Sequence, residues 1–486
     1  MVAVLLPGML ERLIKIAATI AVALIFFRTG PLYFWPFELL ILSAAVLAAF
    51  LFLHYPERFQ ERTTIRHWFF IFALWYLFLI LGTINAHVLY GPQSLELKNF
   101  ILDSYPFFAS GAVFLLIIAF GKQSRFRLGI KLALLAPILF LPFVLLPSKA
   151  AKYLHFLSPT FAFESLMRTS VTYFATLLLV ALIWLLVIQS NPKLKTWQRL
   201  LAWLGTMLSI GLLLWTGVRT AWAMAFFSAM IIWIIRMPAS LKSKHWYEMI
   251  IFPISLLLAL IFGFTALPHR AQLVALSRFF PQITSLENFA ILSRLNVPVE
   301  TLPKNVRSEL GIANDATGTL NPDLTWEVIS TSQALRIIAA NPTFSVPNQS
   351  RTLLWPTAAK LLAKNPWGLG MQYHIATKAI RQSGQITKAH NYFLEAGLTG
   401  GIGALIISFY ILGAAIKSIK KIQPFTEESL WLTLSFWSIF LIAFVNGELF
   451  YTGWIVLALL LTTEHKYNTD QNQKTAKNFQ NTHALA

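Results

Sequence analysis

The sequence contains no cysteine and few charged residues for its length. Asp, Glu, Lys and Arg together make up 12% of the 486 residues, whereas hydrophobic residues make up 57%. An ordinary soluble domain carries about 25% charged residues, so this chain lacks the polar surface to face water on all sides. Without cysteine it forms no disulfide, although that absence identifies no cellular compartment.

Residues that bind nucleotides and metals are also scarce. No glycine-rich phosphate loop of the GxxxxGK[ST] type occurs, which excludes ATP hydrolysis of that kind. No zinc signature with helical histidine spacing is present. Aspartate occurs at four scattered positions that suggest no metal-binding pair, namely Asp103, Asp315, Asp323 and Asp470. The sequence therefore predicts a protein that needs no metal and no other cofactor.

The sequence is rich in apolar runs that could each cross about 30 Å of hydrocarbon. Run length gives about twelve candidate spans, at 10–28, 33–53, 67–88, 102–120, 128–147, 169–189, 199–216, 220–236, 249–267, 392–415, 430–446 and 449–463. We interpret the first as a retained helix, because no convincing cleavage site follows it. The predicted fold class is an all-α, polytopic integral membrane protein.

The net charge of +19 would suggest nucleic-acid binding in a soluble protein. Here the basic residues gather in alternate short loops, which hold Arg58, Arg62, Arg66, Lys122, Arg125, Arg127, Lys193, Lys195, Arg199, Arg236, Lys242, Lys244, Lys417, Lys420 and Lys421. The positive-inside rule places these loops and both termini in the cytoplasm, and it explains the charge without nucleic acid. The spans contain almost no ionisable residues, which argues against a transport path through the membrane.

The same alternation places one long loop on the outward face. The predicted organisation is nine spans in 1–267, the outward loop domain over 268–391, three spans in 392–463 and a disordered cytoplasmic tail over 464–486. A loop this long is expected to be functional.

Helical spacing within the loop predicts that it is mainly helical. The predicted segments are Thr331–Ala340, Ser350–Lys364 and Gln372–Gln382. The middle one is either kinked at Pro356 or begins near it, since proline lacks the N–H that a helix interior needs.

Three outward features carry candidate site residues. Arg219 lies in a tight hairpin between Trp215 and Trp222, where it is either an interfacial anchor or a guanidinium facing phosphate oxygens. Arg351 begins a segment with an apolar face that ends in the turn residues Asn-Pro-Trp-Gly-Leu-Gly. Taken alone, this arginine is interpreted as a surface charge and not as a ligand. His390 precedes Asn391 and a span, where it is either an interface residue or a general base.

Taken together, these features resemble the O-antigen ligase and polymerase family of membrane glycosyltransferases, which includes the bacterial O-oligosaccharyltransferases of pilins. The family pattern is an outer-hairpin Arg, then an Arg-led helix with Pro-x-x-Gly-x-Gly, then His-Asn-x-x-Leu before a span. Arg219, Arg351, Pro366–Gly370 and His390–Leu394 follow that order. The likeness covers roughly residues 200–463. The glycines expected after the His-Asn motif are displaced by one position, at Gly400-Gly401-Ile402-Gly403.

The resemblance implies a GT-C-like fold in the bacterial inner membrane with its active site facing the periplasm. It implies an inverting transfer of a glycan from undecaprenyl pyrophosphate to lipid A-core oligosaccharide, without metal or ATP. His390 would be the catalytic base, and Arg219 and Arg351 would bind the pyrophosphate. Arg168 and Lys388 are further candidates for diphosphate contact.

The resemblance leaves other members open. A polymerase would join two lipid-linked glycans, but polymerases tend to carry basic motifs in two sizeable outward loops, and the second loop here, Ser148 to Arg168, is short. Pilin transferases commonly add a soluble region near the end, whereas this tail is short. Both points favour a ligase. The non-enzymatic alternative is an exporter of lipid-linked glycans.

Overall fold

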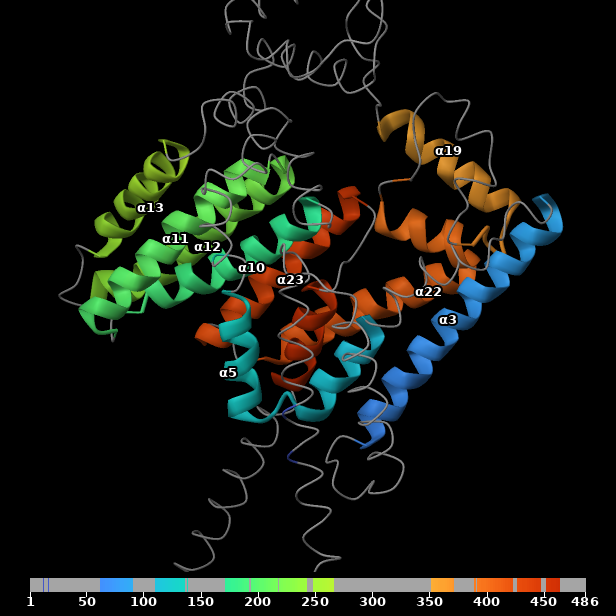
Figure 1. The fold of residues 1–486 in the computed structure, drawn as a ribbon, viewed down its shortest axis with the longest axis horizontal. Coiled ribbons are helices and arrows are strands. Elements are labelled where there is room, and N and C mark those ends of the chain that lie inside the picture. Colours follow the sequence, from blue (N-terminus) through green and yellow to red (C-terminus); the bar gives the residue numbers. More distant parts are fainter. Residues whose placement is uncertain are drawn as a thin grey trace, which may run out of the picture.

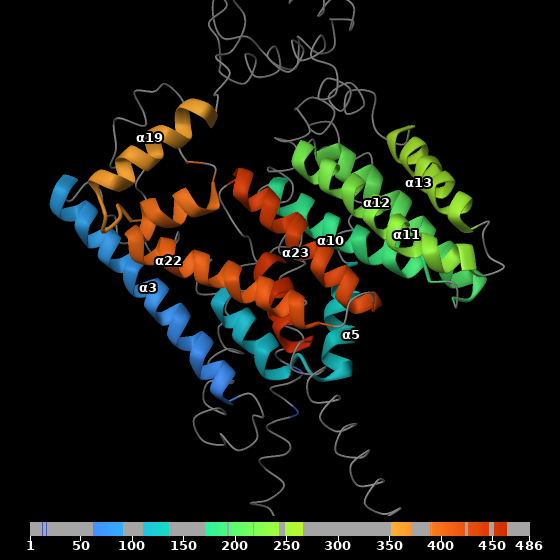
Figure 2. The same cartoon turned by 180° about the vertical axis from the view of Figure 1, so that it is seen from behind.

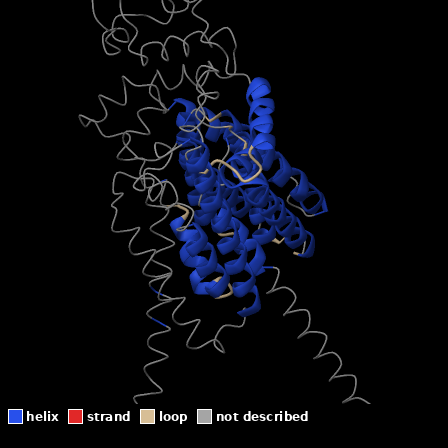
Figure 3. Cartoon of the chain, turned by 90° about the vertical axis from the view of Figure 1, so that its right-hand side faces the viewer, coloured by secondary structure: helices blue, strands red, loops and turns tan. Residues whose placement is uncertain are grey.

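The computed structural model describes residues 12, 16, 62–90, 110–135, 138, 171–191, 194–216, 218–242, 248–265, 351–370, 389, 391–422, 426–446 and 452–463. Every regular element within these ranges is a helix, and none is a strand (Figure 3). The all-α class is therefore confirmed.

The described helices include several that are long and apolar enough to cross a membrane. Their bounds are α3 Arg62–Tyr90, α5 Ser124–Ala133, α10 Val171–Gln189, α11 Thr196–Thr216, α12 Arg219–Lys242, α13 Glu248–Thr265, α19 Arg351–Lys364, α22 Tyr392–Lys421 and α23 Glu427–Asn446. Within the described ranges, six helices meet the length and composition of a membrane span, namely α3, α10, α11, α12, α22 and α23. Shorter apolar helices lie at Ser110–Phe120, Ile250–Thr265 and Thr452–Thr463. The protein is a multi-pass membrane protein, and the total of twelve spans stays a prediction.

Most predicted spans coincide with one of these helices. The segments 67–88, 169–189, 199–216, 220–236, 249–267 and 430–446 correspond to α3, α10, α11, α12, α13 and α23. The segments 102–120 and 449–463 contain the shorter helices at Ser110–Phe120 and Thr452–Thr463. Apart from Arg12 and Ile16, the segments 10–28 and 33–53 lie outside the described residues.

Several predicted boundaries differ from the structure. Helix α3 begins at Arg62, five residues before the predicted 67, and α12 continues to Lys242, six residues past the predicted 236. The span expected over 128–147 begins earlier, at Ser124, and its helix α5 ends at Ala133, where Leu134 and Leu135 form a turn. The span expected over 392–415 continues as α22 to Lys421, so the lysines assigned to a loop form its last turns. Cations in the last turn of a helix complement the negative end of its dipole.

The helices pack as two flanks around a central group (Figures 1 and 2). α3 and α19 lie on one side, α11, α12 and α13 lie on the other, and α10, α22 and α23 run between them. The central helix α10 has almost no exposed side chain along its middle, with Phe174 at 0% exposure. Its backbone carbonyl at Val180 accepts a hydrogen bond from the buried indole of Trp431 on α23, at 3.2 Å. A helix that is apolar all round and buried on every side forms the core.

A buried ion pair ties the start of α5 to two later helices. Arg127 is 5% exposed and donates to Glu428 on α23 at 2.8 Å. It also donates to the hydroxyls of Thr462 and Thr463 at 2.9 and 3.0 Å. The acceptors come from α23, from the helix Thr452–Thr463 and from the carbonyl of Gly121. This pairing offsets the cost of burying the charge and fixes how these segments meet. The loop position predicted for Arg127 is thus wrong.

Candidate functional site

The hairpin between α11 and α12 holds Arg219 at its tip. Two residues connect the helices, and the indole of Trp222 donates to the carbonyl of Leu213 in the last turn of α11, at 2.7 Å. The hydroxyl of Thr216 donates to the same carbonyl at 2.6 Å. Helix C-termini carry carbonyls without intrahelical partners, so these two donors satisfy one of them and close the hairpin.

Arg219 is the first residue of α12, and its side chain is exposed. The residues that follow it are buried, with Ala221 at 0% and Trp222 at 8% exposure. The guanidinium therefore projects from a helix start whose backbone is fixed by packing. The positive end of the helix dipole adds to the charge of the side chain, which favours an anion at this position.

Helix α19 likewise begins at its arginine. Arg351 is the first residue, and Pro356 lies inside the helix instead of starting it. The alternative of a helix that begins near Pro356 is therefore wrong, since α19 begins five residues earlier and contains the proline.

The Pro-x-x-Gly-x-Gly segment binds α22 through its backbone. The amides of Leu369 and Gly370 donate to the carbonyls of Leu398 and Thr399 at 2.7 and 2.9 Å, and the amide of Ile402 donates back to Pro366 at 2.9 Å. These three bonds connect the turn after α19 to a break in α22. Unpaired backbone groups at a helix break are costly in a buried setting, so the turn replaces the lost helical bonds.

The break in α22 lies at Gly400 and Gly401, where Gly401 has a φ of 70°. A Cβ at Gly401 would overlap the carbonyl oxygen of Pro366. On the other side of the turn, Asn85 of α3 donates to the carbonyl of Gly368 at 2.7 Å. The glycine pair that follows the His-Asn motif thus lets α19, α22 and α3 approach at one point.

Replacing Gly401 by alanine is expected to destabilise the protein by about 1–3 kcal/mol, because a Cβ there meets both a left-handed backbone and the Pro366 carbonyl. Gly413 lies in the same helix and has no atom near the position of an added Cβ, so Gly413→Ala is the matched control. The control should be neutral or slightly stabilising. Thermal unfolding in detergent measures both. Equal midpoints for the two variants would contradict this account of the break.

A small second core joins α19 to the start of α22. Ala358 on α19 and Leu398 on α22 are 1% and 0% exposed, and Leu369 and Ala389 complete the cluster. Ala389 directly precedes His390 in the sequence and is 2% exposed. The chain that leads into α22 is therefore anchored against the helix that begins with Arg351.

Asn391 forms the N-cap of α22. Its side-chain oxygen accepts hydrogen bonds from the amides of Phe393 and Leu394 at 3.1 and 3.2 Å. Asn391 is 4% exposed, so its amide side chain serves the helix start. The asparagine of the His-Asn pair therefore stabilises the start of α22. His390, the predicted base, directly precedes this cap in the sequence.

The structure describes some of the predicted site residues and not others. Arg219 is described in full, and Arg351 is described as the first residue of α19 without its side chain. His390, Lys388 and Arg168 lie outside the described residues, as do the helices predicted at Thr331–Ala340 and Gln372–Gln382 and the tail 464–486. Among the described residues, no three His, Asp or Glu side chains form a cluster that could hold a metal ion.

Comparison with known families identifies the segment that contains these features. Residues 204–409 match the family described as O-antigen ligase. Over these residues the chain is similar to the O-antigen ligase family. The match includes most of α11, all of α12, α13 and α19, and most of α22, and it covers the positions of Arg219, Arg351 and His390. Arg168 lies before it. No curated protein matches the chain.

One contact to the matched region comes from a residue outside it that the sequence motifs do not include. Asn85 on α3 lies before the matched region and holds the turn at Gly368. The sequence signal for this contact is that Asn85 is a polar residue four positions before the end of an apolar span. Polar side chains in a membrane helix usually have a partner.

Proposed function

We propose that this protein is an O-antigen ligase, which transfers a glycan from undecaprenyl pyrophosphate to lipid A-core oligosaccharide on the periplasmic face of the inner membrane. The observation that carries the proposal is the order of Arg219, Arg351 and His390 within the segment that matches the O-antigen ligase family. Each of the two arginines begins a helix, and the histidine precedes the cap of a third.

The chemistry needs two tasks from the protein, removal of a proton and stabilisation of the leaving group. The acceptor hydroxyl forms a bond to the anomeric carbon of the donor sugar while the bond from that carbon to the pyrophosphate breaks. His390 takes the hydroxyl proton, and undecaprenyl pyrophosphate leaves with the electron pair of the broken bond. Arg219 and Arg351 stabilise the charge that grows on the leaving group. A single displacement of this kind inverts the anomeric centre.

The helix starts support these roles. A guanidinium at the first residue of a helix combines its own charge with the helix dipole, which suits a pyrophosphate. The donor is already activated, so neither ATP nor metal is required for the leaving group to depart. Lys388, two residues before His390, and Arg168 are further candidates for contacts to the diphosphate.

The packing of α19 against α22 supports a shared site. Ala389 and Asn391, on either side of His390, are 2% and 4% exposed, and Ala389 belongs to the cluster built on α19. The base and Arg351 are therefore carried by segments in direct contact. Such preorganisation lets an enzyme hold reactants in a productive orientation, an effect of about 7–11 kcal/mol in the best cases.

The test uses purified protein with an undecaprenyl-pyrophosphate-linked glycan and lipid A-core acceptor, in chelator and without nucleotide. We expect glycan to appear on lipid A-core. In cells, deletion of the gene should leave polymer on its undecaprenyl carrier and bare core lipopolysaccharide at the surface.

The other members of the family give different products. A longer glycan on the carrier in vitro, or core capped by a single repeat in the deletion strain, would replace the ligase assignment by a polymerase. Loss of glycan from a pilin alone would identify a protein transferase. An exporter would give no transfer in any assay. A strict need for added divalent cation would contradict the proposed chemistry.

A further inference from the structure

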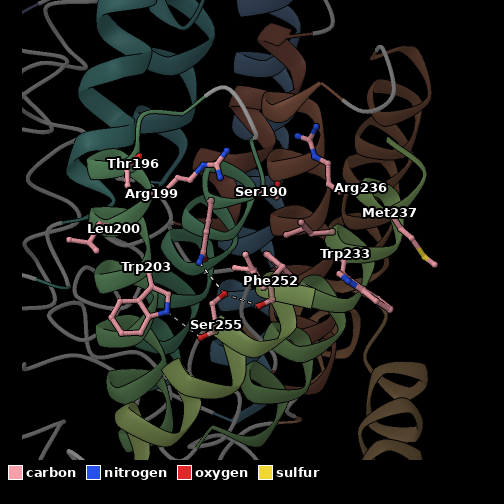
Figure 4. A pocket seen from close by; sticks show the side chains of 13 residues that line it. Ser190, Thr196, Arg199, Leu200, Trp203, Trp233, Arg236, Met237, Phe252 and Ser255 are labelled. Atoms are coloured by element: carbon pink, nitrogen blue, oxygen red, sulfur yellow. Dashed lines mark hydrogen bonds between the residues drawn. The ribbon is translucent and has the colours of Figure 1, made fainter. Parts of the chain in front are cut away.

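A pocket of about 280 Å³ lies among α10, α11, α12 and α13, away from the arginines of the proposed active site (Figure 4). Its lining includes Arg199 and Trp203 of α11, Arg236 of α12 and Ser255 of α13. A single water needs about 10–15 Å³ of such space, so the pocket can hold a chemical group much larger than a water molecule. None of the described residues that line it is acidic.

Arg236 is the unusual residue of this pocket. Its Nε and Nη2 atoms are buried and have no hydrogen-bond partner among the described residues. A buried guanidinium without an acceptor is costly, because it has lost its hydration and gained nothing in return. An acceptor with negative charge at this position would remove that cost.

The neutral donors beside Arg236, Gln189 and Trp203, are already engaged with protein atoms. Gln189 donates to the hydroxyl of Ser255 at 3.3 Å, and the indole of Trp203 donates to the Ser255 carbonyl at 3.3 Å. Arg199 contacts the carbonyl of Asn191 at 3.5 Å. In Figure 4 the guanidinium groups of Arg199 and Arg236 lie on the same side of the pocket, from two different helices. Two positive charges therefore face one space to which the described residues contribute no carboxylate.

The pocket is separate from the proposed active site. Arg236 lies on α12 almost five helical turns after Arg219, a rise of about 25 Å along the helix. That distance is close to the thickness of the hydrocarbon core. The positive-inside rule assigns this end of α12 to the cytoplasmic leaflet, since the neighbouring loops are basic.

The border of the pocket is apolar and exposed. Leu200 on α11 is 66% exposed and Ile251 on α13 is 55% exposed, and both line the pocket. Further along the same helices Leu204 and Ile254 are 41% and 49% exposed. In a membrane protein such faces meet acyl chains. A ligand here can therefore place an anionic group between the arginines and its hydrocarbon against α11 and α13.

We infer that this pocket binds the phosphate of an anionic membrane phospholipid, with its phosphodiester oxygens accepting from Arg236 and Arg199. Arginine suits this ligand because its planar fork matches the spacing of two phosphate oxygens. The apolar border favours a lipid over a free anion. The bound lipid would fill the space at the end of α10 to α13 and join these helices on the side opposite the proposed glycan-transfer site.

The test measures lipid retention by the full-length protein. Delipidated protein is titrated with phosphatidylglycerol, phosphatidylcholine and inorganic phosphate, and binding is followed by native mass spectrometry and by thermal unfolding. We expect phosphatidylglycerol to bind and raise the unfolding midpoint, with little effect of the other two. Arg236→Gln should weaken phosphatidylglycerol binding at least about tenfold, because it removes a charged, bidentate donor.

Arg66→Gln is the matched control, since Arg66 is an exposed cation near the start of α3 and does not line the pocket. It should bind phosphatidylglycerol like the unchanged protein. Equal loss in both variants, or no loss in Arg236→Gln, would overturn the inference. An equal shift with phosphatidylcholine would remove the need for an anionic lipid, and an equal shift with inorganic phosphate would identify a free-anion site in place of a lipid site.

A labelling experiment covers the case in which Arg236→Gln does not fold. Unchanged protein is exposed to phosphatidylglycerol with a photoreactive group at its headgroup, and the adducts are mapped by peptide mass spectrometry. Adducts concentrated around Leu200 and Met237, which both line the pocket, support the site. Adducts spread evenly over the exposed apolar faces of the helices would overturn it.

Discussion

Replacing His390 by alanine is expected to lower the rate of glycan transfer by about 10²–10⁴-fold, the usual contribution of a positioned general base. Alanine cannot take the proton from the acceptor hydroxyl as the new bond forms. The protein should still insert and fold, because the neighbouring packing comes from Ala389 and the helix cap comes from Asn391. Donor binding should be nearly unchanged, since the pyrophosphate contacts are assigned to arginines.

The measurement compares transfer to lipid A-core by the purified variant with binding of the undecaprenyl-linked donor. His87→Ala is the control, because His87 is an exposed histidine in the last turn of α3 and is not assigned to the site. It should transfer glycan at the normal rate. Near-normal transfer by His390→Ala would remove His390 from the mechanism, and loss of donor binding would assign it to the substrate site.

The spans could be predicted closely where a helix contains an uninterrupted apolar run. The predicted segment 169–189 differs from α10 by two residues at its start, and 199–216 begins three residues after α11 and ends with it. Run length is sufficient in these cases because a backbone in hydrocarbon must form its own hydrogen bonds, so the helix extends as far as the apolar residues do.

Polar residues near the span ends were harder to assign. Charge alone placed Arg127 in a basic loop, yet its guanidinium is buried against Glu428 and the hydroxyls of Thr462 and Thr463. Those partners lie far along the chain, and no local pattern connects them. The positive-inside rule reports on the loop as a whole and cannot tell which of its cations is buried.

The site motifs could be found in the sequence, but the contacts among them could not. The glycines at Gly400 and Gly401 were noted as displaced from the family pattern. In the structure these glycines form the break in α22. The turn at Pro366–Gly370 donates hydrogen bonds to carbonyls near that break. The pairing depends on φ values and on the approach of α3 through Asn85, which the order of residue types does not encode.

Replacing Arg219 or Arg351 by alanine is expected to lower transfer by about 10²–10³-fold, the cost of removing one group that stabilises charge in a transition state. Lysine at either position should recover little of this loss, because it keeps the charge but lacks the fork that binds two phosphate oxygens. Arg219 is exposed at the start of α12, so its variants should unfold at the normal temperature. Lys360→Ala, at an exposed position on α19, is the matched control and should be active.

The double variant separates a shared pyrophosphate from two independent contacts. If both guanidinium groups hold the same diphosphate, loss of one disturbs the position of the ligand for the other. The effect of removing both should then be clearly smaller than the product of the single effects. Initial rates at saturating and at low donor concentration measure the effects on kcat and on kcat/KM. If the effect of the double variant equals the product of the single effects, Arg219 and Arg351 act on separate groups. One of the two arginines would then not belong to the proposed pyrophosphate site.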